Sequence, residues 1–97
     1  MQLHDLLERS ARHGLTLQDP GDGSLPSGHN GSYGDVETPA RNTSHWLMTF
    51  VWAHRRSGDP AFRDAAQRAA AYLQSEALRP HGASFWHRSS AHKDSCN

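Results

Sequence analysis

The chain has 97 residues, of which 35% are hydrophobic, and its 10 basic residues balance 10 acidic ones. This length suits one small domain, and the balanced charge argues against nucleic acid or an anionic membrane as a partner, since both select basic surfaces. The single cysteine, Cys96, excludes an internal disulfide and favours a reducing compartment. No apolar stretch has the length of a signal peptide or a membrane span. We therefore predict a cytoplasmic chain that binds neither nucleic acid nor membranes.

Residues 1–14 are predicted to form an amphipathic helix, because leucines recur along one face while charged residues occupy the others. Gly14 is typical of a residue that ends a helix in the left-handed conformation, so we expect the helix to stop there. Residues 15–37 contain five glycines and two prolines, which predicts a long glycine-rich loop without regular structure. Loops of this length are usually functional or disordered, and the apolar residues Leu25 and Tyr33 favour an anchored, functional loop.

Residues 38–79 are predicted to form an antiparallel αα-hairpin. Each helix opens with a capping residue followed by a proline, in Thr38–Pro39 and in Asp59–Pro60. Gly58 lies directly after the first helix, where a C-terminal stop is expected. Because the link between the helices is so short, we expect them to pack side by side. An alanine-rich stripe on the second helix permits a close approach.

The first helix of the hairpin is apolar on nearly every side between Trp46 and Ala53. A helix with this pattern is buried on all sides, and two short neighbouring helices are too small to cover it. We therefore predict that residues 1–97 form a single partial domain of an all-α protein, with an uncovered surface that permits self-association. Residues 80–97 are predicted to form an irregular tail with a short strand-like segment at 83–88.

Three segments carry a family resemblance. Residues 18–24 read Gln-Asp-Pro-Gly-Asp-Gly-Ser, residues 57–62 read Ser-Gly-Asp-Pro-Ala-Phe, and residues 29–46 form a loop that leads into a helix. The first two resemble the turns and hairpins of the α/α-toroid, or six-hairpin, superfamily of carbohydrate-active enzymes. The third is similar to a bacterial toroid group of uncertain activity. The superfamily includes glycosidases, unsaturated-uronyl hydrolases and N-acylglucosamine 2-epimerase-like enzymes.

The resemblance implies an N-terminal piece of an incomplete α/α toroid, since a six-hairpin toroid is far larger than this chain. It further implies part of an enzyme that acts on a sugar or uronate by hydrolysis or epimerisation, with the 97 residues inactive alone. The residues themselves do not decide whether the chain belongs to an enzyme. The alternative is a small helical protein-interaction module without catalytic activity, which docks on a partner through its exposed apolar helix.

The candidate site combines the glycine-rich loop with the first turns of the helix that follows it, which in toroids line a sugar-sized cleft. Carboxylate and imidazole groups suit acid–base chemistry near neutral pH, and we predict catalytic roles for Asp35, His45 and His29. Arginine, amide and aromatic side chains suit a sugar or uronate, because they form bidentate contacts with carboxylates or stack on a ring. The predicted substrate-binding residues are Asn30, Tyr33, Arg41, Asn42, Trp46 and His87. Helix-capping and ion-pair roles are the competing interpretation for the charged members of this group.

A third interpretation is a zinc site formed by His81, His87, His92 and Cys96. Their spacings are looser than those of the paired ligands in structural zinc sites, and only one thiolate is present. We therefore predict neither a metal ion nor another cofactor.

Overall fold

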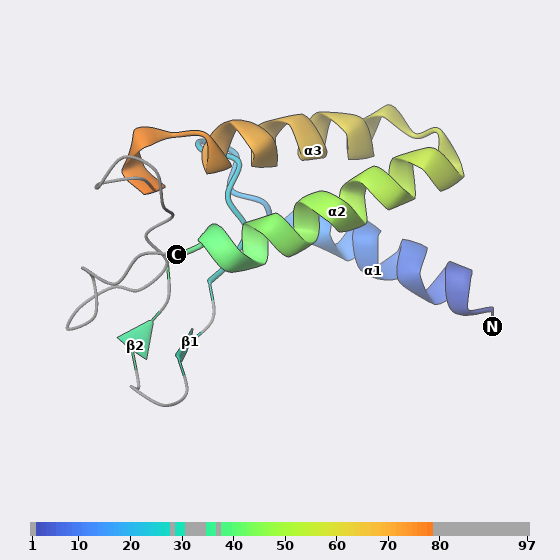
Figure 1. The fold of residues 1–97 in the computed structure, drawn as a ribbon. Coiled ribbons are helices and arrows are strands. Elements are labelled where there is room, and N and C mark those ends of the chain that lie inside the picture. Colours follow the sequence, from blue (N-terminus) through green and yellow to red (C-terminus); the bar gives the residue numbers. More distant parts are fainter. Residues whose placement is uncertain (1, 28, 31–34, 37, 79–97) are drawn as a thin grey trace.

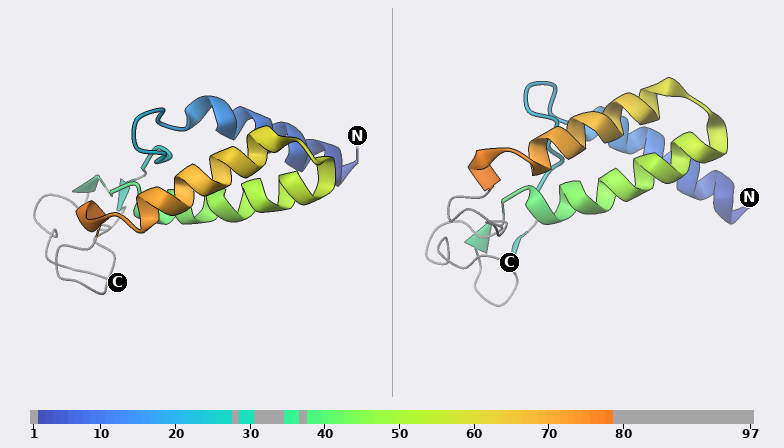
Figure 2. Two further views of the ribbon diagram at one scale, coloured as in Figure 1. Left: turned by 90° about the horizontal axis from the view of Figure 1, so that it is seen from above. Right: turned by 45° about the horizontal axis from the view of Figure 1, so that its top comes forward.

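The computed structural model describes residues 2–27, 29–30, 35–36 and 38–78, which form a mainly helical structure (Figure 1). Helix α1 spans Leu3–Leu17, α2 spans Ala40–Ser57 and α3 spans Pro60–Leu73, with a 3-10 turn, η1, at Glu76–Leu78. Strands β1 (His29–Asn30) and β2 (Asp35–Val36) form a two-residue antiparallel ladder before α2. Helices α2 and α3 lie side by side, and α1 packs against both of them (Figures 1 and 2). The predicted all-α fold, with a first helix and an antiparallel αα-hairpin, is confirmed.

Helix α1 continues through Gly14 to Leu17, so the prediction that it stops at Gly14 is wrong. The reason is a contact between helices. A Cβ atom at Gly14 would lie 2.6 Å from Cε3 of the Trp46 indole and closer still to Cζ3. Glycine costs a helix interior about 1 kcal/mol relative to alanine, and here the close packing of the indole on α1 offsets that cost.

The turn between the hairpin helices follows its predicted signals closely, whereas α3 ends at Leu73, six residues before the predicted end of the hairpin at 79. Gly58 ends α2 in the left-handed conformation, with φ 74°, and its N–H donates to the carbonyl of His54 (2.7 Å). The carboxylate of Asp59 caps α3 by accepting a hydrogen bond from the N–H of Ala61 (2.9 Å). Helix α2 begins one residue later than predicted, since Pro39 occupies the position before its first helical residue. The prediction is therefore accurate to one residue where α2 begins.

The core lies between the three helices and is built largely from small and aromatic side chains. Phe50 of α2 and Phe62 of α3 are fully buried, with ring centroids 6.4 Å apart. Alanines on the facing sides of the hairpin let its helices approach closely, as the alanine stripe predicted. The buried ones are Ala40, Ala53, Ala65, Ala66 and Ala69.

The segment from Gln18 to Leu25 follows α1 and is fixed in place by side chains. The buried amide of Gln18 donates to the carbonyl oxygens of Gly23 (3.0 Å) and Ala65 (2.9 Å). The backbone N–H of Leu25 donates to the hydroxyl of Thr43, which is fully buried on α2 (2.9 Å). This part of the predicted loop is therefore an ordered turn attached to both helices of the hairpin. Its buried polar groups are hydrogen-bonded to α2 through Thr43 and to α3 through the carbonyl of Ala65.

Apolar side chains of α1 and α2 reach the surface. Met48 is 65% exposed and Val51 37%, while Leu3 and Leu6 on α1 are 66% and 51% exposed. Within the part of the chain that the structure describes, no helix is both long and apolar enough to cross a membrane. The predicted tail at 80–97 lies outside the described residues, and the single partial domain stays a prediction.

Candidate functional site

The backbone ladder brings three of the predicted site residues together. His29 pairs with Val36, and Asn30 pairs with Asp35, in antiparallel register. The two predicted catalytic residues of the loop, His29 and Asp35, therefore belong to one ladder, directly before α2. Two predicted substrate-binding residues lie outside the described residues, and their roles stay predictions: Tyr33 and His87.

The first two turns of α2 carry the other four predicted site residues. The amide of Asn42 donates to the carbonyl of Pro26 (2.8 Å), which ties the loop to the helix. Trp46 is partly buried, and its ring packs into the core between α1 and α2. Arg41 and His45 are exposed on the helix surface. These side chains therefore divide between a loop contact, the core and the surface.

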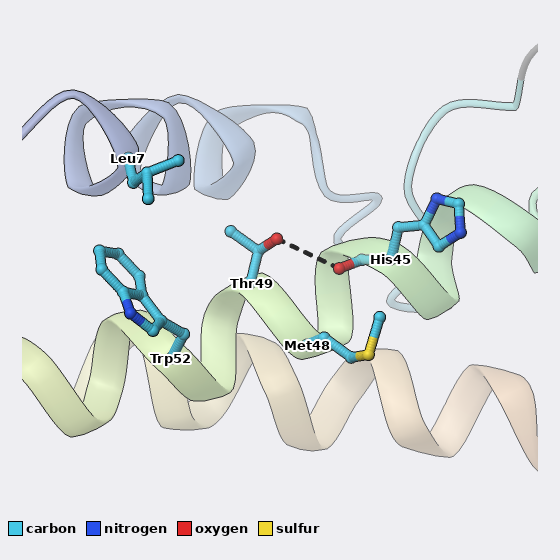
Figure 3. Close-up of a pocket in the computed structure, with 5 residues that line it drawn as sticks. All are labelled: Leu7, His45, Met48, Thr49 and Trp52. Carbon is cyan, nitrogen blue, oxygen red and sulfur yellow. Dashed lines mark hydrogen bonds between the residues drawn. The ribbon is translucent and has the colours of Figure 1, made fainter. Parts of the chain in front are cut away.

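An open pocket of about 370 Å³ lies between α1 and α2 (Figure 3). Its lining residues are Leu7, His45, Met48, Thr49 and Trp52. The four from α2, at positions 45, 48, 49 and 52, follow the i, i+3, i+4, i+7 spacing that places residues along one side of a helix. Figure 3 shows Trp52 at one end of this row, His45 at the other and Thr49 between them, with Leu7 reaching down from α1. The pocket therefore requires both helices.

The pocket is mainly apolar, but three of its side chains carry groups that can form hydrogen bonds with a ligand: those of Trp52, Thr49 and His45. The Thr49 hydroxyl donates to the backbone carbonyl of His45 (3.2 Å), so its oxygen retains acceptor capacity. The partly buried indole of Trp52 packs against the core, and its centroid lies 6.2 Å from that of the His4 ring on α1. Because the lining contains no carboxylate, lysine or arginine, it suits an uncharged ligand.

Two groups with shifted pKa values lie outside this pocket, where they contribute to packing. The backbone N–H of Ala61 and then the guanidinium of Arg12 lower the pKa of Asp59, at the start of α3. Burial raises the pKa of Tyr72 to about 12, with a further contribution from the carboxylate of Asp22. The first shift therefore reflects mainly the cap of α3, and the second mainly the burial of Tyr72.

Among the residues that the structure describes, no group of three or more His, Cys, Asp or Glu side chains is arranged to hold a metal ion. The residues of the zinc interpretation lie outside the described ranges: His81, His87, His92 and Cys96.

The sequence pattern assigned no site role to most of the pocket residues. Met48 and Trp52 belong to the apolar run of α2, which predicts core positions, and Leu7 belongs to the apolar face of α1. Their common spacing along α2 was a usable signal, because it places 45, 48, 49 and 52 on one side. Which side of α2 remains open, however, depends on where α1 and α3 pack.

Comparison with curated proteins identifies a similar protein. Over 95 residues, or 98% of this chain, the sequence is 56% identical to archaeal glycosylation protein Q of Haloferax volcanii. The matched region is 25% of that protein, so the chain spans about a quarter of the length of the curated relative it matches. No family model matches the chain, and no solved structure does.

This match corrects the α/α-toroid interpretation. The similar protein is named for glycosylation, whereas the resemblance implied hydrolysis or epimerisation of a sugar. The segments at 18–24 and 57–62 carry turn and capping residues that many helical proteins use, and such signals do not identify a family. The prediction of a hydrolase or epimerase fragment is therefore wrong, and the match gives no support to a non-catalytic interaction module either.

Proposed function

We propose that this chain acts in glycosylation, the process for which its Haloferax relative is named. The observation that carries the proposal is the extent of the match, which is 56% identity over 98% of the chain. The match therefore extends over all three helices and over the pocket that α1 and α2 form.

A sugar is the ligand class that we propose for this function. Glycosylation moves sugar units, so a protein that takes part in it either binds a sugar or assists a protein that does. The pocket offers an aromatic surface beside hydrogen-bonding groups, which is the combination that small-molecule sites use for orientation and specificity. We place the chain in the cytoplasm, because its single cysteine suits a reducing compartment.

The proposal is tested by exchanging the matched region between the two proteins. In H. volcanii cells that lack glycosylation protein Q, a chimaera would carry this chain in place of the matched quarter of that protein. Glycosylation of a reporter glycoprotein would be measured by mass spectrometry of its glycopeptides. We expect the chimaera to restore the glycan that intact protein Q restores.

Two controls give this experiment its meaning. Protein Q reintroduced unchanged sets the full signal, and protein Q without its matched quarter sets the background. A chimaera that accumulates as a folded protein but gives only the background signal would contradict the proposed function.

A further inference from the structure

We infer that the pocket between α1 and α2 binds a neutral pyranose sugar, with Trp52 as the surface on which the ring stacks. This inference rests on the proposed function and names the ligand and the site within it. The sequence pattern alone predicts ring stacking by Trp46 and Tyr33 instead.

The size of the pocket fits such a ligand. Its volume of about 370 Å³ lies within the range of roughly 300–1,000 Å³ for small-molecule sites. The pocket opens to solvent along the groove between α1 and α2 (Figure 3). A sugar lying there keeps its outer hydroxyl groups in water, so the pocket has to satisfy only those on the inner side.

Trp52 has the properties of a stacking surface. One face of a pyranose ring presents C–H groups, and an indole offers a large apolar surface with one N–H donor at its edge. The ring of Trp52 is partly buried against the core and lies near His4 of α1, so its orientation is restrained from two sides. A restrained aromatic side chain loses little conformational entropy when a ligand binds to it.

Two polar side chains that line the pocket beside Trp52 can bond to sugar hydroxyl groups. Thr49 follows Trp52 along the row, and its oxygen accepts a hydrogen bond while its proton is held by the carbonyl of His45. The imidazole of His45, at the far end of the row, donates or accepts. No arginine or lysine lines the pocket to pair with a carboxylate, so we expect glucose to bind at least as well as glucuronate.

The experiment is a titration of the 97-residue chain observed by NMR. The indole N–H resonances of its three tryptophans, one of them Trp52, would be followed during addition of D-glucose, D-glucuronate or the open-chain polyol sorbitol. The Trp52 resonance is assigned from its absence in Trp52→Phe. We expect glucose to give a saturable shift of this resonance, with much smaller shifts at Trp46.

Variants then connect the shift to binding. Trp52→Ala should weaken glucose binding by about tenfold or more, because it removes the stacking surface, and Trp52→Phe should weaken it less. Val51→Ala is the matched control, since Val51 is a neighbouring exposed apolar residue that does not line this pocket, and it should leave the affinity unchanged.

Three results would overturn the inference. These are the absence of a saturable Trp52 shift with glucose in the unmodified chain, tighter binding of glucuronate than of glucose, and an equal shift with sorbitol. The first of these needs no variant, so it holds even if Trp52→Ala fails to fold. A chimaera that restores glycosylation without such a shift would leave the proposed function standing and remove only this site.

Discussion

Gly23 offers a sharp test of the turn that attaches the loop to α3. Its backbone is left-handed, with φ 81°, and a Cβ atom at this position would lie 2.7 Å from the carbonyl carbon of Arg68 and closer to the carbonyl oxygen. Gly58 is a matched control, because it is also left-handed, with φ 74°, but a Cβ atom there would meet nothing within 4 Å. The two glycines share backbone strain and differ in the contact.

The expected losses of stability follow from this difference. The left-handed conformation costs a non-glycine residue about 1–2 kcal/mol, and Gly58→Ala should lose about that much. Gly23→Ala should lose about 1–3 kcal/mol more, the usual cost of forcing extra volume into a packed site. The blocking atoms at Gly23 belong to the backbone of α3, so a side-chain rotation does not relieve the contact.

The assay is urea unfolding followed by far-UV circular dichroism, with the free energy of unfolding extrapolated to water for each variant. An unchanged slope against urea confirms that the variants unfold as the parent chain does. Equal losses for Gly23→Ala and Gly58→Ala would refute the reasoning, because they would show that the turn does not press against α3.

Three further predictions concern single contacts. The phenol of Tyr72 ionises near pH 10 in the unfolded chain and near 12 in the folded one. The parent chain should therefore lose about 2–3 kcal/mol of its free energy of unfolding as the pH rises from 10 to about 12, and Tyr72→Phe should remove this loss. Identical alkaline stability profiles for the parent and Tyr72→Phe would contradict this prediction. Gln18→Ala should lower the free energy of unfolding by about 1–3 kcal/mol, since two buried carbonyl oxygens lose their donor. The control is Gln67→Ala, which should have little effect in the same urea assay because Gln67 is exposed. Arg12→Ala should reduce, but not abolish, the loss of stability on acidification below pH 3.8. The reason is that a backbone N–H makes the largest contribution to the lowered pKa of Asp59 and Arg12 a smaller one. An acid stability profile that is the same in the parent and in Arg12→Ala would show that this ion pair has no role.

The sequence predicted the hairpin well because its signals are local. A capping carboxylate, a proline and a left-handed glycine act within a few residues of one another, so Asp59, Pro60 and Gly58 need no knowledge of the rest of the fold. Gly14 shows the limit of such signals. Its sequence context is that of a helix stop, but the indole of Trp46, 32 positions away in the chain, makes it a packing position inside α1.

The candidate site was predicted less well, for a related reason. The residue types that suit catalysis and sugar binding lie in the loop and at the start of α2, and of these only His45 lines the pocket. The other pocket residues of α2 are Met48, Thr49 and Trp52, further along that helix. Met48 and Trp52 resemble core residues in a hydrophobicity pattern, because a pattern reports the character of a face and not which neighbour covers it. The placement of α1 and α3 determines that this side of α2 is partly open.

The attachment of α1 has a dynamic consequence. Besides its buried apolar contacts and the guanidinium of Arg12 over the ring of Phe62, α1 contacts the hairpin through exposed ion pairs such as Arg12 with Asp59 (3.0 Å) and Asp5 with Arg56 (3.5 Å). Exposed ion pairs contribute little free energy and weaken in salt. Elements held in this way open as units well below the free energy of global unfolding. Since Leu7 belongs to α1, each opening of α1 dismantles the pocket. A ligand in the pocket therefore links two helices, and its affinity depends on the fraction of molecules in which α1 is closed.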